Sequence, residues 1–561
     1  MIDLIERARA WIAGDPDPAT RSELEALIAS GDLDELSDRL DRSLEFGTAG
    51  LRGPVGAGPN RMNLAVVIRA TAGLGSYLGE GPPGPVIVGF DARPDSREFA
   101  EAVAAVLCAR GFPVRYFPEP TPTPLVAYAA KHLGAVAAVV ITASHNPPTD
   151  NGYKVYDRNA AQIIPPTDTA IRGRIDEVGS ADEVPRRPDV FTGQRPLASP
   201  LGEEIFEAYW AEIARVRSRS NGSDLRIAYT PMHGVGGDYV SELFHRAGHT
   251  GLDIVEEQAK PDGTFPTVSF PNPEESGALD LALALGGKVE ADLILANDPD
   301  ADRLAAVVAV PSGGFRQLSG NELGVLLGDY LLRGHRLAQR PVVVSSVVST
   351  PMMHAVADAH DARHVVTLTG FKWIANAGLA LEEAGEGRFV FGFEEALGYS
   401  VGGVVRDKDG LSAALLFADL VADLAENDET VLDRLVQLWS QHGVWSSAQV
   451  SIPGEPGDLT AAVERLGSEP PEALADLDVV GIRDFRKGAE TRPPWLGLQD
   501  LIELSLGEAG RVLIRPSGTE PKLKIYVDLR AAPRGDLVEQ QRSLLDDAES
   551  LGRVVAGELG L

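Results

Sequence analysis

Ser144 lies in a segment that could carry a nucleophile, Ile141-Thr142-Ala143-Ser144-His145-Asn146-Pro147. The small apolar residues before it predict a buried strand, so Ser144 should be presented at a strand end as a surface hydroxyl. A serine flanked by His and Asn can be activated. Thr142 and Asn146 stand where the Gly-x-Ser-x-Gly elbow of α/β hydrolases has glycines, which disfavours acyl hydrolysis. The competing interpretation is a polar turn whose side chains cap the backbone.

Three carboxylates at period two, Asp298, Asp300 and Asp302, follow the strand-like run Leu293–Ala296. In an extended chain this alternation brings them to one side, where three hard oxygen donors suit Mg²⁺. An EF-hand is excluded because Arg303 stands at its glycine position and Ala309 at its terminal Glu position. A solvated acidic turn is the alternative, but charges this dense cost energy without a cation.

Two further loops favour ligand binding. Gly392-Phe393-Glu394-Glu395 follows a strand and could accept hydrogen bonds from sugar hydroxyls, although a solvated Glu pair would look the same. Arg515-Pro516-Ser517-Gly518-Thr519-Glu520-Pro521-Lys522 offers two hydroxyls, glycine-permitted N–H groups and two cations to a phosphate dianion. A plain hairpin turn is the alternative for the second loop.

The chain-wide composition limits the classes of partner. The 561 residues are 44% hydrophobic and 24% charged, as in a folded protein, and the net charge is −31. This charge disfavours non-specific electrostatic binding to nucleic acid or to an anionic membrane, so an anionic ligand needs a local basic pocket. The single cysteine, Cys108, is expected to fill a core. No basic leader or long apolar stretch is visible, and we expect a cytoplasmic protein.

The elements that must position these loops repeat along the chain. A strand, helix, strand pattern occurs at 86–90, 98–110 and 114–117, again at 225–229, 237–247 and 252–255, and again at 342–348, 351–359 and 363–368. Three α/β domains in series are therefore expected, with ligand loops beyond the carboxyl ends of mostly parallel strands. From residue 431 the pattern changes to helix, then strands, then a helix after Arg534, which predicts a smaller fourth domain.

These four loops, in this order, resemble the α-D-phosphohexomutases, the phosphoglucomutase/phosphomannomutase superfamily. Phe46-Gly47-Thr48-Ala49-Gly50-Leu51-Arg52-Gly53 and Thr369-Gly370-Phe371-Lys372-Trp373-Ile374 also resemble motifs of that family. The resemblance implies three tandem related α/β domains with mixed, mostly parallel sheets and a smaller α+β C-terminal domain, around a central cleft. The expected domains are 1–200 with the serine loop, 201–314 with the metal loop, 315–430 with the sugar loop and 431–561 with the phosphate loop.

The resemblance also implies a chemistry. Ser144 would be carried as phosphoserine, and one Mg²⁺ per chain would be bound by Asp298, Asp300, Asp302 and Ser144. Phosphoryl transfer to a sugar monophosphate would make a sugar bisphosphate, the intermediate and activator. The implied catalytic residues are Ser144, Arg52, His145, Lys154, Lys408 and Arg303, and the sequence does not assign the base among them. The implied substrate-binding residues are Glu394, Glu395, Gly370, Lys372, Arg515, Ser517, Gly518, Thr519 and Lys522.

The implied reaction interconverts sugar 1-phosphates and 6-phosphates of glucose or mannose, with small sugar phosphates as the only partners of a monomer or homodimer. Many hexose mutases have Glu-x-Ser in the sugar loop, whereas this chain has Ala396. It thereby resembles the branch of phosphopentomutases and sugar-bisphosphate synthases. Two rivals stay open: a non-catalytic sugar-phosphate-binding protein, and an aspartyl phosphatase with Asp298 as nucleophile, whose motif wants Thr or Val where Asp302 stands.

Overall fold

The computed structural model describes residues 2–47, 50–192, 197–334, 338–516 and 522–559. Contacts divide the chain into two compact units, one formed by Met1–Gln317 with Gly398–Asp419 and the other by Leu318–Leu397 with Leu420–Leu561. Within the described part of the chain, no helix combines the length and the apolar character that a bilayer crossing requires.

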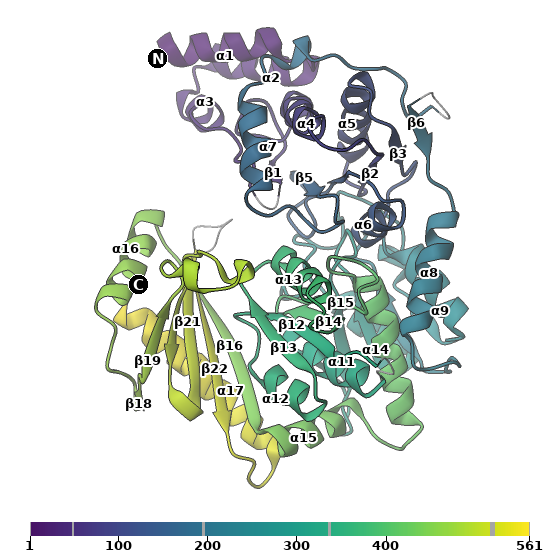
Figure 1. The fold of residues 1–561 in the computed structure, drawn as a ribbon, viewed down its shortest axis with the longest axis vertical. Helices are drawn as coiled ribbons and strands as arrows, with labels where there is room; N and C mark the ends of the chain where they lie inside the picture. The colour runs from purple at the N-terminus through teal and green to yellow at the C-terminus, as the bar shows by residue number, and fades with distance from the viewer. Residues whose placement is uncertain (1, 48–49, 193–196, 335–337, 517–521, 560–561) are drawn as a thin grey trace. The chain divides into compact units, whose positions relative to one another are not determined.

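The first unit begins with a small helical bundle, drawn in purple in Figure 1, which packs on its own apolar cluster around Leu24 and Leu36. A six-stranded mixed sheet follows, in the order β1-β5-β4-β2-β3-β6. β2, β3, β4 and β6 run parallel, β5 pairs antiparallel with β4, and β1 pairs antiparallel with β5. The elements are α1 (Ile2–Gly14), α2 (Pro18–Ser30), α3 (Leu33–Leu40), β1 (Leu51–Pro54), α4 (Leu64–Leu78), β2 (Val86–Phe90), α5 (Ser96–Ala109), β3 (Val114–Tyr116), α6 (Thr123–His132), β4 (Ala137–Ile141), β5 (Asp150–Tyr156), α7 (Thr167–Asp176), η1 (Ala181–Glu183) and β6 (Ala198–Pro200).

The central strands of this sheet are buried on both faces, which accounts for their continuous apolar sequences. All five residues of β2 and of β4 are buried, because α5 and α6 both pack against these central strands. Strands covered on both faces need apolar residues at every position, and the runs Val86–Phe90 and Ala137–Ile141 supply them. Cys108 is buried in the same core, which confirms its predicted role as filler. The candidate loops can therefore begin only where these strands end.

The second sheet of this unit has the order β11-β10-β9-β7-β8. β7, β8 and β9 are parallel, β10 pairs antiparallel with β9, and β11 pairs antiparallel with β10. The sharp reversal between β9 and β10 is the segment that holds Asp298, Asp300 and Asp302. The elements are α8 (Glu204–Val216), β7 (Ile227–Thr230), α9 (Gly237–Ala247), β8 (Leu252–Ile254), η2 (Glu256–Gln258), α10 (Asp280–Val289), β9 (Leu293–Ala296), β10 (Ala305–Ala309) and β11 (Phe315–Gln317). The later segment Gly398–Asp419 of this unit holds β15 (Gly398–Val401), which is not a strand of this sheet, and the first part of α14 (Gly410–Ala425).

The second unit opens with parallel strands, in which β12 lies between β13 and β14. The predicted strand 342–348 ends earlier than expected, because Ser349 N–H donates to the carbonyl of Ser346 and turns the chain. The elements are α11 (Gly320–Gly334), β12 (Pro341–Ser346), α12 (Met352–Ala359), β13 (Arg363–Thr367), α13 (Phe371–Glu383) and β14 (Arg388–Glu394).

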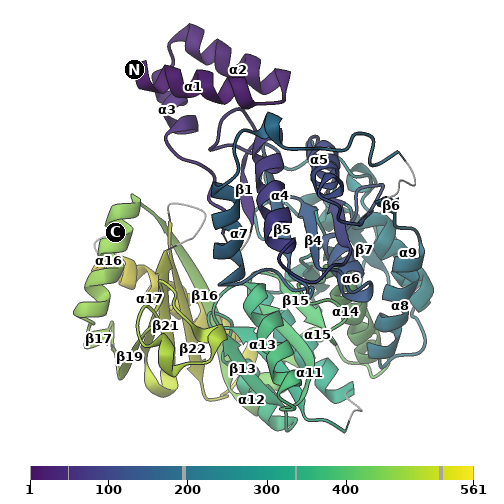
Figure 2. The ribbon, with the colours of Figure 1, turned by 45° about the horizontal axis from the view of Figure 1, so that its top comes forward.

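An antiparallel five-stranded sheet, β16-β22-β21-β20-β19, completes this unit and confirms the predicted change of fold toward the C-terminus. The long helix α17 packs across β16 and β22, as Figures 1 and 2 show. The elements are α15 (Val431–His442), β16 (Val444–Pro453), α16 (Pro456–Ser468), β17 (Ala473–Leu474), β18 (Leu477–Asp478), β19 (Gly481–Asp484), η3 (Ala489–Thr491), η4 (Pro494–Leu496), β20 (Ile502–Ser505), η5 (Gly507–Ala509), β21 (Gly510–Pro516), β22 (Lys522–Ala531) and α17 (Leu537–Glu558).

Candidate active site

Ser144 follows the carboxyl end of β4 and adopts a left-handed backbone conformation, with a φ of 54°. Its hydroxyl donates a hydrogen bond to Asp298 Oδ2 at 2.8 Å and lies 3.1 Å from Nδ1 of His145. Its N–H donates to the hydroxyl of Thr142 at 2.8 Å. The residue is only 3% exposed, so the expectation of a surface hydroxyl is wrong. The hydroxyl instead faces the predicted metal loop directly.

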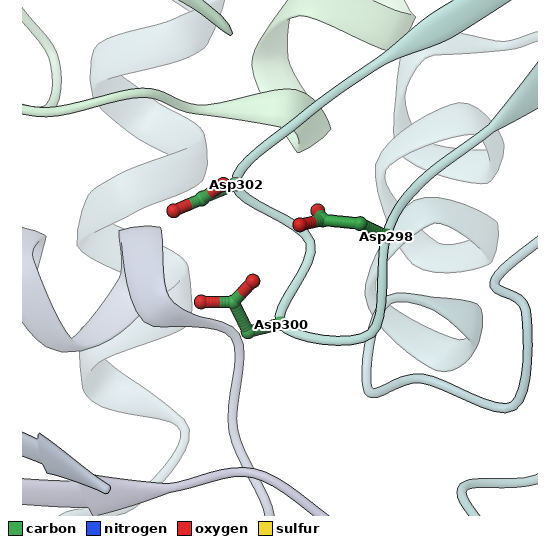
Figure 3. A group of neighbouring side chains, drawn as sticks. All are labelled: Asp298, Asp300 and Asp302. Atoms are coloured by element: carbon green, nitrogen blue, oxygen red, sulfur yellow. The ribbon is translucent and has the colours of Figure 1, made fainter. Parts of the chain in front are cut away.

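The metal loop brings its three carboxylates together as predicted. Carboxylate oxygens of Asp298, Asp300 and Asp302 all lie within 4.8 Å of one another, and all three side chains are buried. Figure 3 shows them extending to the same side of the loop between β9 and β10. The turn tightens at Ala301, which has a φ of 57°, and Arg303 N–H donates to Asp298 Oδ1 at 3.0 Å. A solvated acidic turn is therefore excluded.

The carboxylates differ in their electrostatic surroundings. Burial, reinforced by the charges of Asp300 and Asp302, raises the pKa of Asp298 to about 8. Burial would also raise the pKa of Asp302, but Lys154 and Lys408 overcome it and hold that pKa well below its usual range. The cost of ionising Asp298 beside two other buried carboxyls disappears when a cation joins them.

Two buried oxygens test whether a metal ion fits. Asp300 Oδ1 and Asp302 Oδ1 have no hydrogen-bond partner among the described residues, and both are closed to water. An unpartnered buried carboxylate oxygen is costly, whereas Mg²⁺ takes hard oxygen ligands at about 2.0–2.1 Å, closer than a water could approach. Two buried carboxylate oxygens are thus left for an ion to satisfy, and the remaining positions of a Mg²⁺ shell would be open to water and a phosphate oxygen. The residues present fit the ion.

A group of cations surrounds the carboxylates. Lys154, on β5, donates to Asp300 at 2.7 Å and to Asp302 at 2.9 Å, and Lys408 lies 3.1 Å from Asp302. Burial alone would lower the pKa of Lys154, but Asp300 and Asp302 raise it, so the amine stays charged. Gly410 allows the Lys408 loop to approach, because a Cβ there would come within 2.3 Å of the Arg303 carbonyl.

Arg52 and His145 complete this side of the site. Arg52, on β1, donates to the side chain of Asn146 at 3.2 Å. Burial, and then the charges of Arg303 and Arg52, lower the pKa of His145 well below its ordinary value. The imidazole is therefore neutral next to the serine hydroxyl. The structure thus brings together Ser144, the three aspartates and the predicted residues Arg52, His145, Lys154, Arg303 and Lys408.

The predicted sugar-loop residues belong to the second unit. Glu394 Oε1 accepts the N–H of Gly370 at 2.7 Å, so the two predicted loops meet. Lys372 follows on the first turn of α13. The carboxylate of Glu395 instead accepts hydrogen bonds from Ser346 and Ser349, at 3.0 and 3.3 Å.

The predicted phosphate loop is described only at its two ends. Arg515 Nη1 donates to the hydroxyl of Thr369 at 2.6 Å, which links β21 to the Gly370 loop. Lys522 is the first residue of β22. Ser517, Gly518 and Thr519 lie outside the described residues, as do Thr48 and Ala49 of the N-terminal motif.

Sequence reasoning missed three residues that hold these loops. Thr123 donates from its hydroxyl to Asp300 at 2.7 Å, Gln499 contacts Thr369, and Arg93 binds the loop that carries Ser144. Arg93 follows a strand-like run and could have been flagged as a strand-end polar residue, whereas Thr123 is the first residue of α6 and carries no such signal. Gln499 sits in an irregular segment and carries no such signal.

Models of four protein domains match the chain in succession. The α/β/α domains I, II and III of phosphoglucomutase/phosphomannomutase match residues 43–182, 207–312 and 319–442, and the C-terminal domain matches 455–541. These ranges cover most of the chain. The chain belongs to the phosphoglucomutase/phosphomannomutase family. As a member of this family it is a phosphomutase, an enzyme of the isomerase class, and not a non-catalytic binding protein or an aspartyl phosphatase.

Sequence alignments with related proteins cover most of this phosphomutase chain. It is 38% identical to the probable phosphomannomutase of Haemophilus influenzae, over 84% of this chain and 93% of that one. It is 35% identical to the phosphopentomutase of Mus musculus, over 97% and 93%. The putative phosphomannomutase of Thermus thermophilus shares the fold, with a TM-score of 0.67 and 22% identity over 91% of this chain and 99% of that chain. Family and fold class are thus confirmed.

Proposed function

We propose that this phosphomutase interconverts the 1-phosphate and 6-phosphate of a hexose, glucose or mannose, through a phosphoserine at Ser144 and a sugar bisphosphate. The observation that carries this proposal is the 2.8 Å hydrogen bond between Ser144 Oγ and Asp298 inside a buried three-carboxylate cluster ringed by cations. A phosphoryl group on that oxygen would lie among the groups that phosphoryl transfer needs for alignment and charge neutralisation.

The reaction balances in two halves. In the first, the bond between phosphorus and Ser144 Oγ breaks, and a bond forms between phosphorus and the free hydroxyl oxygen of the sugar monophosphate. The hydroxyl proton leaves to a basic group, for which the neutral His145 is the candidate, because Lys154 stays charged and has no lone pair to accept it. The bisphosphate then turns over and returns its other phosphate to Ser144. In this second half the proton returns to the sugar oxygen from which the phosphate departs. The net change moves one phosphate between two positions of the sugar.

The proposed metal is Mg²⁺, held by Asp298, Asp300, Asp302 and an oxygen of phosphorylated Ser144. When bound, it would neutralise charge on the phosphoryl oxygens. Lys154 and Lys408 hold the pKa of Asp302 well below its usual range, so this carboxyl stays ionised and ready to bind a cation. Arg52 and Arg303 would stabilise the transferring phosphoryl group.

The second unit would bind the part of the substrate that does not react. We propose that Arg515, Ser517, Gly518, Thr519 and Lys522 hold the other phosphate, and that Glu394, with Gly370 and Lys372, binds sugar hydroxyls. Glu395, whose carboxylate accepts hydrogen bonds from Ser346 and Ser349, is the second glutamate that we propose for this role.

A coupled assay with glucose 1-phosphate and mannose 1-phosphate tests the proposed reaction directly. We expect 6-phosphate to form in the presence of Mg²⁺ and a catalytic amount of glucose 1,6-bisphosphate, and to stop when a chelator is added. Release of inorganic phosphate in place of 6-phosphate would contradict a mutase.

A second candidate substrate, a pentose phosphate, is favoured by one residue. The half-buried Ala396 leaves the sugar loop without the hydroxyl that many hexose mutases have there. Loss of one compensated hydrogen bond costs about 0.5–1.5 kcal/mol, which shifts a preference without abolishing it. We therefore propose that ribose or deoxyribose 1-phosphate is turned over within about a hundredfold of glucose 1-phosphate.

Ala396→Ser should move this preference toward hexose, because it restores a hydroxyl to the loop. The measurement is kcat/KM for glucose 1-phosphate and ribose 1-phosphate in both proteins, with Ala384→Ser at the end of α13 as the control. If the wild type ignores pentose phosphates and the variant keeps the same ratio, Ala396 does not set specificity. Net accumulation of a bisphosphate would favour a sugar-bisphosphate synthase.

A further inference from the structure

Arg93 is a buried cation close to the serine loop that the proposed chemistry does not use. It follows β2 in the segment Asp91-Ala92-Arg93, at the same sheet edge as Ser144. Its side chain is 1% exposed. A guanidinium buried this deeply must find partners for all of its hydrogen-bond donors.

All five N–H groups of Arg93 have an acceptor. Nε donates to Asp91 Oδ2 at 3.2 Å. The four terminal N–H groups donate to backbone carbonyls, those of Pro147, Asp150, Ser144 and Asn146, at 2.6, 2.8, 2.8 and 2.7 Å. A guanidinium has five N–H donors and no more, so none is left for a substrate phosphate. Arg93 therefore acts on the protein backbone and not on the ligand.

The four carbonyls belong to one loop, residues 144–150, which begins at the nucleophile. Ser144 has a φ of 54°, a conformation that residues other than glycine adopt only when their surroundings impose it. Arg93 supplies that constraint, because its guanidinium donates to the backbone carbonyl of Ser144 and to three further carbonyls of the 144–150 segment. The same loop carries Asn146, whose side chain accepts from Arg52.

Arg93 is itself held in place from two sides. Asp91 Oδ1 accepts the N–H of Arg93 at 3.0 Å and the hydroxyl of Ser96 at 2.6 Å, which fixes the carboxylate. The ring of Phe265 lies 5.1 Å from the guanidinium carbon, in cation–π range. None of these contacts of Asp91 and Phe265 with Arg93 involves the loop that carries Asp298, Asp300 and Asp302.

We propose that Arg93 is a positioning residue for phosphoryl transfer, which fixes the 144–150 loop so that Ser144 Oγ points at Asp298. The inference rests on the proposed function. A lysine ammonium has three N–H donors, whereas the guanidinium of Arg93 uses five. A lysine at this position would keep the positive charge but could not make all of these hydrogen bonds. Because the metal carboxylates lie on a different loop, Arg93 should govern the position of the serine and leave unchanged the metal affinity of the dephosphorylated enzyme, in which Ser144 offers no phosphate oxygen to the ion; Mn²⁺ affinity is therefore measured in that state.

The test compares Arg93→Lys with Arg97→Lys, an arginine on the exposed side of α5 that pairs with Glu101. Two quantities are measured for each protein: the rate at which glucose 1,6-bisphosphate phosphorylates dephosphorylated Ser144, and the affinity for Mn²⁺ as a probe of the metal site. We expect Arg93→Lys to slow phosphorylation by more than about tenfold, with Mn²⁺ affinity within about threefold of wild type. Arg97→Lys should change neither quantity.

Asp91→Asn provides a second variant that keeps Arg93 and should give a smaller loss of the same kind, and it decides the question if Arg93→Lys does not fold. Unchanged phosphorylation rates, or an equal loss of rate and Mn²⁺ affinity, would overturn the positioning role. If wild-type Ser144 accepts no phosphate from the bisphosphate, the proposed function itself fails.

Discussion

Ser144 gains its chemical character from its neighbours. Its hydroxyl lies between a carboxylate and an imidazole and is withdrawn from water, which is an environment that strengthens electrostatic interactions. The adjacent Asp298 is the carboxyl whose pKa the cluster raises to about 8. Chemistry at this residue thus depends on a second loop that comes from a different sheet.

Ser144→Ala should abolish the phosphoenzyme and remove more than about 3 kcal/mol of transition-state stabilisation, over a hundredfold in kcat. The fold should survive, because the variant loses two hydrogen bonds, to Asp298 and to His145, each worth about 1 kcal/mol. Turnover is measured in the coupled assay and stability by thermal unfolding. Ser76→Ala, on α4, removes a hydroxyl bonded to a helix carbonyl and serves as the control. Near-normal turnover of Ser144→Ala would contradict the assignment.

Asp300→Asn keeps the shape of the side chain but removes its single negative charge. One Asp300 oxygen accepts hydrogen bonds from Thr123 and Lys154, and the other has no partner among the described residues. The substitution should therefore mainly weaken the binding of the metal ion. We expect the Mg²⁺ concentration for half-maximal activity to rise by at least about tenfold. Asp292→Asn, outside the loop and paired with Arg226, is the control. Full activity of either protein in excess chelator would mean that no metal is needed.

At the scale of elements, the site consists of strand ends and the reversals that follow them. β4 ends at Ile141, before Ser144, β9 ends at Ala296, before the aspartates, and β14 ends at Glu394. The three segments that follow are held by bonds from Arg93, Thr123 and Gly370, respectively. The β21–β22 hairpin differs, because its cations sit at the ends of two antiparallel strands.

Arg515→Ala and Lys522→Ala should each cost about 2–4 kcal/mol in kcat/KM, because charge-assisted bonds to a phosphate are lost. Ser144 should still accept phosphate in both variants, because the metal loop and its cations are unchanged. Arg534→Ala, an exposed arginine beyond the hairpin, is the control. Wild-type kinetics in both variants would remove this hairpin from the site.

Part of this organisation could be predicted from the sequence. Strand-length apolar runs and period-two carboxylates are local patterns, and they placed Ser144 and the three aspartates at strand ends. The burial of Ser144, its left-handed backbone and the five bonds of Arg93 depend on loops from distant segments, so no local pattern contains them. The helices α1 to α3 also precede any motif that we interpreted.

At the scale of the whole molecule, a net charge of −31 contrasts with the basic groups gathered around one buried acidic cluster. Such an arrangement excludes long polyanions by overall repulsion while it retains local sites for a sugar phosphate. The two units each carry part of the predicted machinery, with the nucleophile and the aspartates in one and Glu394, Arg515 and Lys522 in the other.

The most direct measurement of the central claim is intact-protein mass spectrometry of the purified enzyme, with and without glucose 1,6-bisphosphate and Mg²⁺. We predict a species heavier by one phosphate, located at Ser144 by peptide mapping, increased by the bisphosphate and absent from Ser144→Ala. An enzyme that turns over sugar phosphates while Ser144 never carries phosphate, or carries it at another residue, would contradict the claim.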